Sequence, residues 1–107
     1  MITIKAKNYK DLKQKTIGLI GKDRAENIYF ETRSGIHTFG LKFPIDVLVL
    51  DEKNKVVKLK EELIPNSLFF WNPKYKKVLE LQPETISKQK IKTGSSINIE
   101  LINQTKR

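Results

Sequence analysis

A histidine and an aspartate near the middle of the chain are the residues best suited to acid–base chemistry. His37 is the only histidine in the sequence, and Asp46 lies in the apolar segment that follows it. An antiparallel hairpin that pairs Phe39 with Pro44 would, in the same register, pair His37 with Asp46. A carboxylate that accepts a hydrogen bond from imidazole fixes the tautomer and orientation of the ring, as it does for a general base. One hypothesis, a hydrolase or isomerase, therefore rests on these two residues.

A structural role for the histidine is the interpretation we favour. Strand alternation places His37 on one face with the apolar residues Phe39, Leu41 and Phe43. A lone histidine on such a face usually bonds a backbone group or a neighbouring carboxylate. The sequence has no second histidine, no glycine-rich phosphate loop and no serine-centred nucleophile motif to complete a catalytic site. We therefore assign no catalytic residue and favour a protein that is not an enzyme.

Metal and cofactor chemistry finds no support in the composition. The 107 residues include no cysteine, which removes thiolate zinc sites, iron–sulfur clusters and disulfides together. One histidine with scattered carboxylates is a weak ligand set for zinc or iron. We predict no metal site and no cofactor.

The elements that would position these residues are mostly strands. Alternating or apolar runs separated by turn signals predict strands at 2–7, 28–30, 34–43, 45–50, 55–60, 68–71, 77–81 and 96–102. Two short helices are expected, one from about 8 to 20 and one from Glu84 to about 91. So many strands with closely spaced turns are typical of an antiparallel β-sandwich or a barrel-like fold. The length allows one core, so residues 1–107 are expected to form a single domain.

Two carboxylates outside the histidine region have structural interpretations. Asp51 follows an apolar strand and precedes a turn, so its side chain should bond the backbone amides of that turn. Glu80, between Leu79 and Leu81, is expected on the opposite face from these two residues, where it points outward or towards Lys77 and Lys58 as an ordinary surface ion pair.

The strongly basic balance raises the possibility of a nucleic-acid partner. The net charge is +9, with 21 lysines and arginines against 12 carboxylates. Positive fields attract nucleic acid and acidic partners. However, the basic residues are mostly lysines scattered along the chain, whereas nucleic-acid readers concentrate arginine on one element. Nucleic-acid binding therefore stays open as an alternative that we do not favour.

Residues 68–77 combine aromatic rings with lysines. Such interleaving occurs on single-stranded nucleic-acid platforms, but three consecutive rings at 69–71 must alternate in direction, so at least one enters the core. We favour core packing followed by a solvated turn. Lys74, Lys76 and Lys77 are the candidate contacts for phosphate or for an acidic partner.

The leading functional hypothesis is a non-enzymatic module that binds a small ligand or a protein partner. The rare polar and aromatic residue types suggest a candidate binding pocket formed by His37, Phe39, Lys42, Asp46 and Trp71. The first 20 residues carry five lysines and no long apolar run, unlike a signal peptide, and no run is long enough to span a membrane. We expect a soluble cytoplasmic protein.

Several segments of the chain also resemble a known family. They are Gly18-Leu19-Ile20-Gly21-Lys22, Ile36 to Val47, Leu50-Asp51, Pro65, Val78-Leu79-Glu80-Leu81 and Ile91-Lys92-Thr93-Gly94. Over residues from about 16 to 100, the chain resembles the bacterial and archaeal family named domain of unknown function 192. The chain departs from that family's pattern at Glu84, at Ser95 and in its lysine-rich loop after Trp71. The resemblance implies a compact, mostly β sandwich and no established activity.

Overall fold

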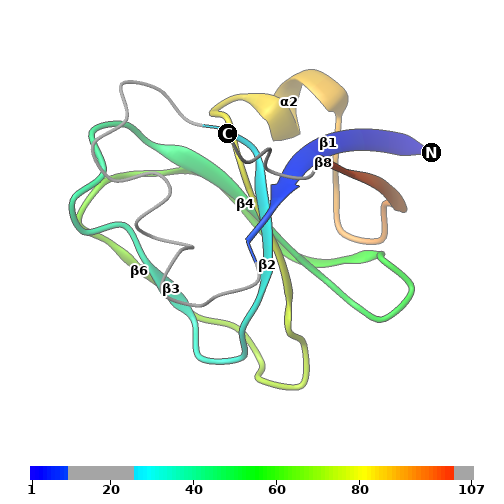
Figure 1. The fold of residues 1–107 in the computed structure, drawn as a ribbon, viewed down its shortest axis with the longest axis horizontal. Helices are drawn as coiled ribbons and strands as arrows, with labels where there is room; N and C mark the ends of the chain where they lie inside the picture. The colour runs from blue at the N-terminus through cyan, green and yellow to red at the C-terminus, as the bar shows by residue number, and fades with distance from the viewer. Residues whose placement is uncertain (10–25, 103–107) are drawn as a thin grey trace, which may run out of the picture.

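The computed structural model describes residues 1–9 and 26–102, which form mostly β structure (Figure 1). The predicted mostly β fold is confirmed. With the labels of Figure 1, the strands in these residues are β1 (Ile2–Asn8), β2 (Ile28–Glu31), β3 (Ile36–His37), β4 (Ile45–Leu50), β5 (Val56–Leu63), β6 (Leu68–Phe69), β7 (Lys77–Leu81) and β8 (Ile97–Ile102), and the helix is α2 (Thr85–Gln89).

Six of these strands form one mixed sheet in the order β5-β4-β7-β2-β1-β8. The pairs β5–β4, β4–β7 and β7–β2 are antiparallel, whereas β1 runs parallel to both β2 and β8. The prediction of a wholly antiparallel sheet is therefore wrong for β1. Alternation within a strand does not report the direction of its neighbours, and β8 reaches β1 from the opposite end of the sequence.

The outer strands of this sheet approach each other without closing a barrel. Lys55 and Ser96 form an isolated antiparallel bridge, and the backbone N–H of Val56 donates to the carbonyl of Ser95 at 2.9 Å. Among the strands that the structure describes, β5 otherwise pairs only with β4. The second sheet consists of β3 and β6 alone. The sandwich form of the prediction is therefore confirmed and the barrel form is not.

Apolar side chains pack on both faces of the large sheet. Its strand β4 is therefore buried at every position. Val47 and Val49 belong to the core cluster that includes Phe69 of β6. Leu48 belongs to the cluster on the opposite face, which includes Ile86 of α2. The small sheet thus covers one face of the large sheet, and α2 covers the other.

The predicted strand at 34–43 is correct only for its two residues in β3. After β3 the chain turns, and the N–H of Leu41 donates to the carbonyl of Thr38 at 3.2 Å. Gly40 has a φ of 87°, a conformation that favours glycine. The alternation in the sequence therefore does not correspond to one continuous strand.

One of the two predicted helices lies in the described part of the chain, as α2. It is shorter than expected and ends at Gln89, and the capping residue Lys90 has a left-handed conformation with a φ of 55°. Most of the other predicted helix, at about 8 to 20, falls outside the described residues. Asn8, its expected capping residue, is the last residue of β1. No helix described in the structure is long and apolar enough to cross a membrane.

Candidate functional site

His37 and Asp46 lie in different sheets. His37 of β3 pairs with Leu68 of β6, whereas Asp46 of β4 pairs with Leu81 of β7. The imidazole Nδ1 accepts a hydrogen bond from the backbone N–H of Phe39 at 3.2 Å. The predicted pairing of His37 with Asp46 is wrong, because the chain turns after His37 instead of continuing into a hairpin. The acid–base pair required by the hydrolase or isomerase hypothesis is therefore not formed.

Asp46 is fully buried and bonds the backbone of two other elements. Its Oδ1 accepts the N–H of Glu62 at 2.9 Å, and its Oδ2 accepts the N–H of Ile86 at 2.9 Å. Glu62 lies at a register irregularity of β5 and has a φ of 51°. The carboxylate thus joins β4 to this bulge and to α2, which compensates for its burial. It does not reach the surface on which His37 lies.

The two-stranded sheet has a buried face and an exposed face. Ile36 and Phe69 pair across it and enter the core, so His37 and Leu68, the next pair, share the outer face. On this face the imidazole stacks on Phe39, with ring centroids 4.9 Å apart. The ring of Phe70 lies against Gly35, because a Cβ at that glycine would come within 2.4 Å of the ring.

Four large apolar side chains are exposed on and beside this small sheet. The exposed fractions are 47% for Phe39, 64% for Ile64, 57% for Leu68 and 56% for Phe70. We call these residues together with His37 the ribbon face. Several large apolar side chains exposed around one small sheet indicate an interaction site more strongly than a single exposed residue does.

Buried Thr38 holds the segments of the ribbon face in place. Its hydroxyl donates to the carbonyl of Ile64 at 2.7 Å and accepts the N–H of Ser67 at 2.8 Å. Its backbone N–H donates to the carbonyl of Ser67 at 2.9 Å. These bonds connect the turn that carries Phe39 to the segment that precedes β6.

The remaining members of the predicted pocket divide between surface and core. Lys42 is exposed, and it follows the turn that carries Phe39. Trp71 is buried next to Phe69, and its indole N–H donates to the carbonyl of Tyr75 at 2.8 Å. The prediction that at least one ring of 69–71 enters the core is therefore confirmed. The structure brings His37 and Phe39 together at the surface and places Asp46 and Trp71 in the interior.

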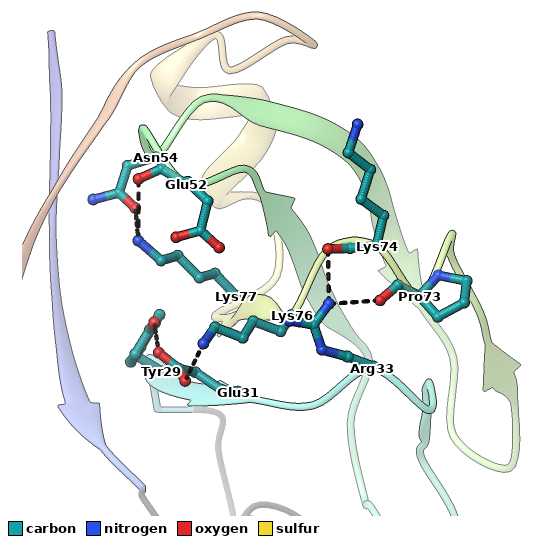
Figure 2. Close-up of polar contacts among 9 residues, drawn as sticks. All are labelled: Tyr29, Glu31, Arg33, Glu52, Asn54, Pro73, Lys74, Lys76 and Lys77. Atoms are coloured by element: carbon teal, nitrogen blue, oxygen red, sulfur yellow. Dashed lines mark hydrogen bonds and ion pairs between the residues drawn. The ribbon is translucent and has the colours of Figure 1, made fainter.

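The three lysines of the following loop have different environments (Figure 2). Lys76 lies 3.6 Å from the carboxylate of Glu31. The ammonium of Lys77 donates to the carbonyl of Glu52 at 3.3 Å and to the side chain of Asn54 at 3.1 Å. Lys74 is exposed, with its ammonium 5.7 Å from the Tyr75 ring. Two of the three lysines thus have polar partners within the fold.

The two other carboxylates with structural predictions had different outcomes. Asp51 accepts the N–H groups of Lys55 and Lys53 at 2.9 and 2.8 Å, as expected, and these bonds lower the pKa of its carboxyl. The prediction for Glu80 is wrong, because its side chain is buried. Glu80 of β7 pairs with Ile28 of β2 on one side and with Val47 of β4 on the other. It therefore lies on the same buried face as these two residues.

The sequence interpretation missed Ile64, Leu68 and Phe70 as surface residues. A signal was present, because residues 68–71 are apolar at every position. A strand that is covered on one face must expose every second residue of such a run. The sequence did not show which face would be covered.

Two solved structures are similar to this chain in fold. A crystal structure of a candidate transcription regulator from Sinorhizobium meliloti 1021 has a TM-score of 0.65 and 18% identity, with 86% of this chain and 76% of that chain covered. A protein of unknown function from Novosphingobium aromaticivorans DSM 12444 has a TM-score of 0.70 and 15% identity, with 86% and 70% covered. At such identities the likeness establishes the fold alone. A search of curated protein sequences finds no match.

The sequence also matches a family model. The model, DUF192, is described as "Uncharacterized ACR" and matches residues 2–99. The match includes the turn after β3, the buried strand β4 and the region of α2. Because it extends over nearly the whole chain, this protein belongs to the DUF192 family.

Proposed function

We propose that this protein is a non-enzymatic interaction module that binds an acidic, apolar segment of a partner protein on its ribbon face. The observation that carries the proposal is the exposure of Phe39, Ile64, Leu68 and Phe70 around one small sheet. Aromatic and large aliphatic side chains provide most of the binding energy at protein interfaces. Burying the exposed half of one such side chain contributes roughly 1 kcal/mol before the costs of association.

The ribbon face is also suited to binding because it is rigid before a partner arrives. The stacking of His37 on Phe39, the packing of Phe70 on Gly35 and the bonds of Thr38 limit the freedom of its side chains and segments. A preorganised surface loses little conformational entropy on binding. This arrangement supports recognition more than it supports chemistry, since the only histidine has no carboxylate partner among the described residues.

The charge of the chain favours an acidic partner over a second copy. The ammonium of Lys58 donates to the carbonyl of Phe70 at 2.7 Å and lies 5.0 Å from the Phe69 ring. Exposed Lys42 follows the turn that carries Phe39. Two copies of a chain with a net charge of +9 repel each other, whereas acidic residues on a partner complement these lysines.

A peptide-display selection tests the proposal. The whole chain is the target, and the Ile64→Ser/Leu68→Ser variant is the counter-target. We expect enriched peptides that combine Asp or Glu with Leu, Phe or Trp. Their affinity should fall at least about tenfold on Leu68→Ser, which corresponds to one buried anchor residue. Ile102→Ser removes a similarly exposed side chain from β8, so it is the matched control and should bind like the wild type.

Three results would contradict the proposal. One is a selection that enriches no peptide over the counter-target. Another is a loss of peptide affinity in Ile102→Ser as large as the loss in Leu68→Ser. The third concerns the nucleic-acid alternative and comes from anisotropy titrations with short DNA and RNA at two salt concentrations. Binding that falls steeply with salt and is unchanged by Leu68→Ser would assign the positive surface to nucleic acid instead.

A further inference from the structure

We infer that a pocket between the turn at 51–55 and the loop at 72–75 binds a small organic phosphate. The pocket has a volume of about 440 Å³ and is lined by Leu50, Asp51, Glu52, Lys53, Lys55, Lys74 and Tyr75. This volume is within the range of small-molecule sites, roughly 300–1,000 Å³. The pocket shares no lining residue with the ribbon face, and the inference goes beyond the proposed function.

The first wall of the pocket is a turn held by its own hydrogen bonds. The carboxylate of Asp51 accepts the N–H groups of Lys53 and Lys55, and the backbone N–H of Asp51 donates to the carbonyl of Lys55 at 2.9 Å. The N–H of Asn54 donates to the carbonyl of Asp51 at 2.9 Å. Lys53 and Lys55 therefore project from a fixed backbone.

The second wall is fixed in the same way. The side-chain oxygen of Asn72 accepts the N–H of Lys74 at 2.9 Å, and the indole of Trp71 donates to the carbonyl of Tyr75. The guanidinium of Arg33 donates to the carbonyls of Pro73 and Lys74, both at 2.8 Å (Figure 2). The two walls therefore hold the backbone from which the lysines of the pocket project.

Three exposed lysines line the pocket. In the described part of the chain, Lys53, Lys55 and Lys74 form no ion pair, in contrast to Lys76, which pairs with Glu31. Two carboxylates, Asp51 and Glu52, also line the pocket, and Asp51 interacts electrostatically with Lys53 and Lys55. The three lysines therefore outnumber the two carboxylates by one charge, and the backbone N–H groups that Asp51 accepts offset part of its repulsion of an anion.

The lining selects an organic phosphate rather than a free ion. Lysine ammonium groups are effective point charges for phosphate, and three of them suit a dianion better than a carboxylate. The half-buried ring of Tyr75 adds apolar surface beside these charges, whereas Leu50 forms the fully buried floor below it. A ligand with a phosphate and an apolar or planar part uses both components of the pocket.

An NMR titration of the whole chain tests this inference with phenyl phosphate, inorganic phosphate and benzoate. We expect saturable amide shifts at 51–55 and 72–75, with phenyl phosphate bound at least about tenfold more tightly than either other probe. Lys55→Gln/Lys74→Gln should weaken phenyl phosphate binding by about tenfold or more. Lys90→Gln/Lys92→Gln removes the same charge from exposed positions near α2 and should bind like the wild type.

Several outcomes of the titration would contradict the proposed phosphate site. Equal losses in the two double variants would assign the binding to the overall charge of +9, and benzoate binding as tight as phenyl phosphate would exclude phosphate selectivity. Shifts scattered over the chain, or no saturation, would overturn the site. Amide spectra of the free variants establish their folding. Because the ribbon face uses other residues, either proposal can fail while the other holds.

Discussion

The imidazole of His37 stacks on the ring of Phe39, with ring centroids 4.9 Å apart and ring planes inclined by 21°. The same imidazole accepts the backbone N–H of Phe39, so one side chain holds both the ring and the main chain of its neighbour. Phe39 remains 47% exposed in this arrangement. The histidine therefore positions an exposed aromatic ring.

Gly35 should resist substitution because Phe70 covers it. In Gly35→Ala the new Cβ would lie 2.4 Å from the ring and 3.0 Å from the carbonyl of Phe69, at a φ of 89°. We expect a loss of about 2–4 kcal/mol in the free energy of unfolding from overpacking and backbone strain. Gly94→Ala is the matched control, because its φ is 93° but nothing lies within 4 Å. It should cost only about 1 kcal/mol in urea denaturation. Equal losses would contradict the packing of Phe70 on Gly35.

Thr38→Val should destabilise the segments that carry the ribbon face. The isosteric change removes the hydroxyl that donates to Ile64 and accepts from Ser67, leaving both backbone groups without this partner. We expect a loss of about 1–3 kcal/mol in urea unfolding. Thr38→Ser keeps the hydroxyl and should therefore recover most of the stability that Thr38→Val loses. A serine variant as unstable as the valine variant would show that the methyl group, not the hydroxyl, provides the stability.

Asp46→Ala should be among the most destabilising single changes in this protein. It removes a fully buried carboxylate that accepts the N–H groups of Glu62 and Ile86. Hydrogen bonds to a charged group contribute roughly 1.5–3 kcal/mol each, so we expect a loss of about 3 kcal/mol or more. Asp46→Asn keeps one accepting oxygen and should lose less.

Hydrogen exchange distinguishes this role of Asp46 from a general loss of stability. The amides of Glu62 and Ile86 should exchange faster in Asp46→Asn, relative to those of central β4, than in the wild type. Unchanged relative protection would contradict the two bonds.

Asp51 should make folding stability depend on pH in acid. Hydrogen bonds from the backbone of Lys55 and Lys53 lower the pKa of its carboxyl from the ordinary value of 3.8. A group with a lowered folded pKa stabilises the protein above its unfolded pKa, and this contribution is lost as the pH falls through the folded pKa. Urea midpoints measured from about pH 6 down to pH 2 should therefore fall more for the wild type than for Asp51→Asn. Parallel curves would contradict the assignment to Asp51.

Predictions made from local patterns largely held for the strands of the large sheet. The apolar run of β4 and the alternation of β1 each occur at the predicted place, because burial of one or both faces leaves a periodic record in the sequence. The turn at Asp51 was also predicted correctly, because the Asp51 side chain bonds backbone amides within four residues of it. The family resemblance also held, and the matching model covers residues 2–99.

Other features depended on which strands become neighbours. His37 pairs with β6 and Asp46 contacts α2, although the sequence places the two residues close together. Glu80 is buried because it shares a face with Ile28 and Val47 on neighbouring strands. Alternation divides the side chains of a strand into two sets but does not identify the set that will be covered.

The sequence by itself therefore determined the mostly β class, the buried central strand and the family. Only the tertiary structure decided that Leu68 of the small β3–β6 sheet and Phe39 of the turn beside it are exposed, and that two distant turns bring Lys53, Lys55 and Lys74 to one pocket. The physical reason is one of range. Periodicity and turn preference act within a few residues, whereas strand pairing and the meeting of loops depend on contacts between segments far apart in the chain.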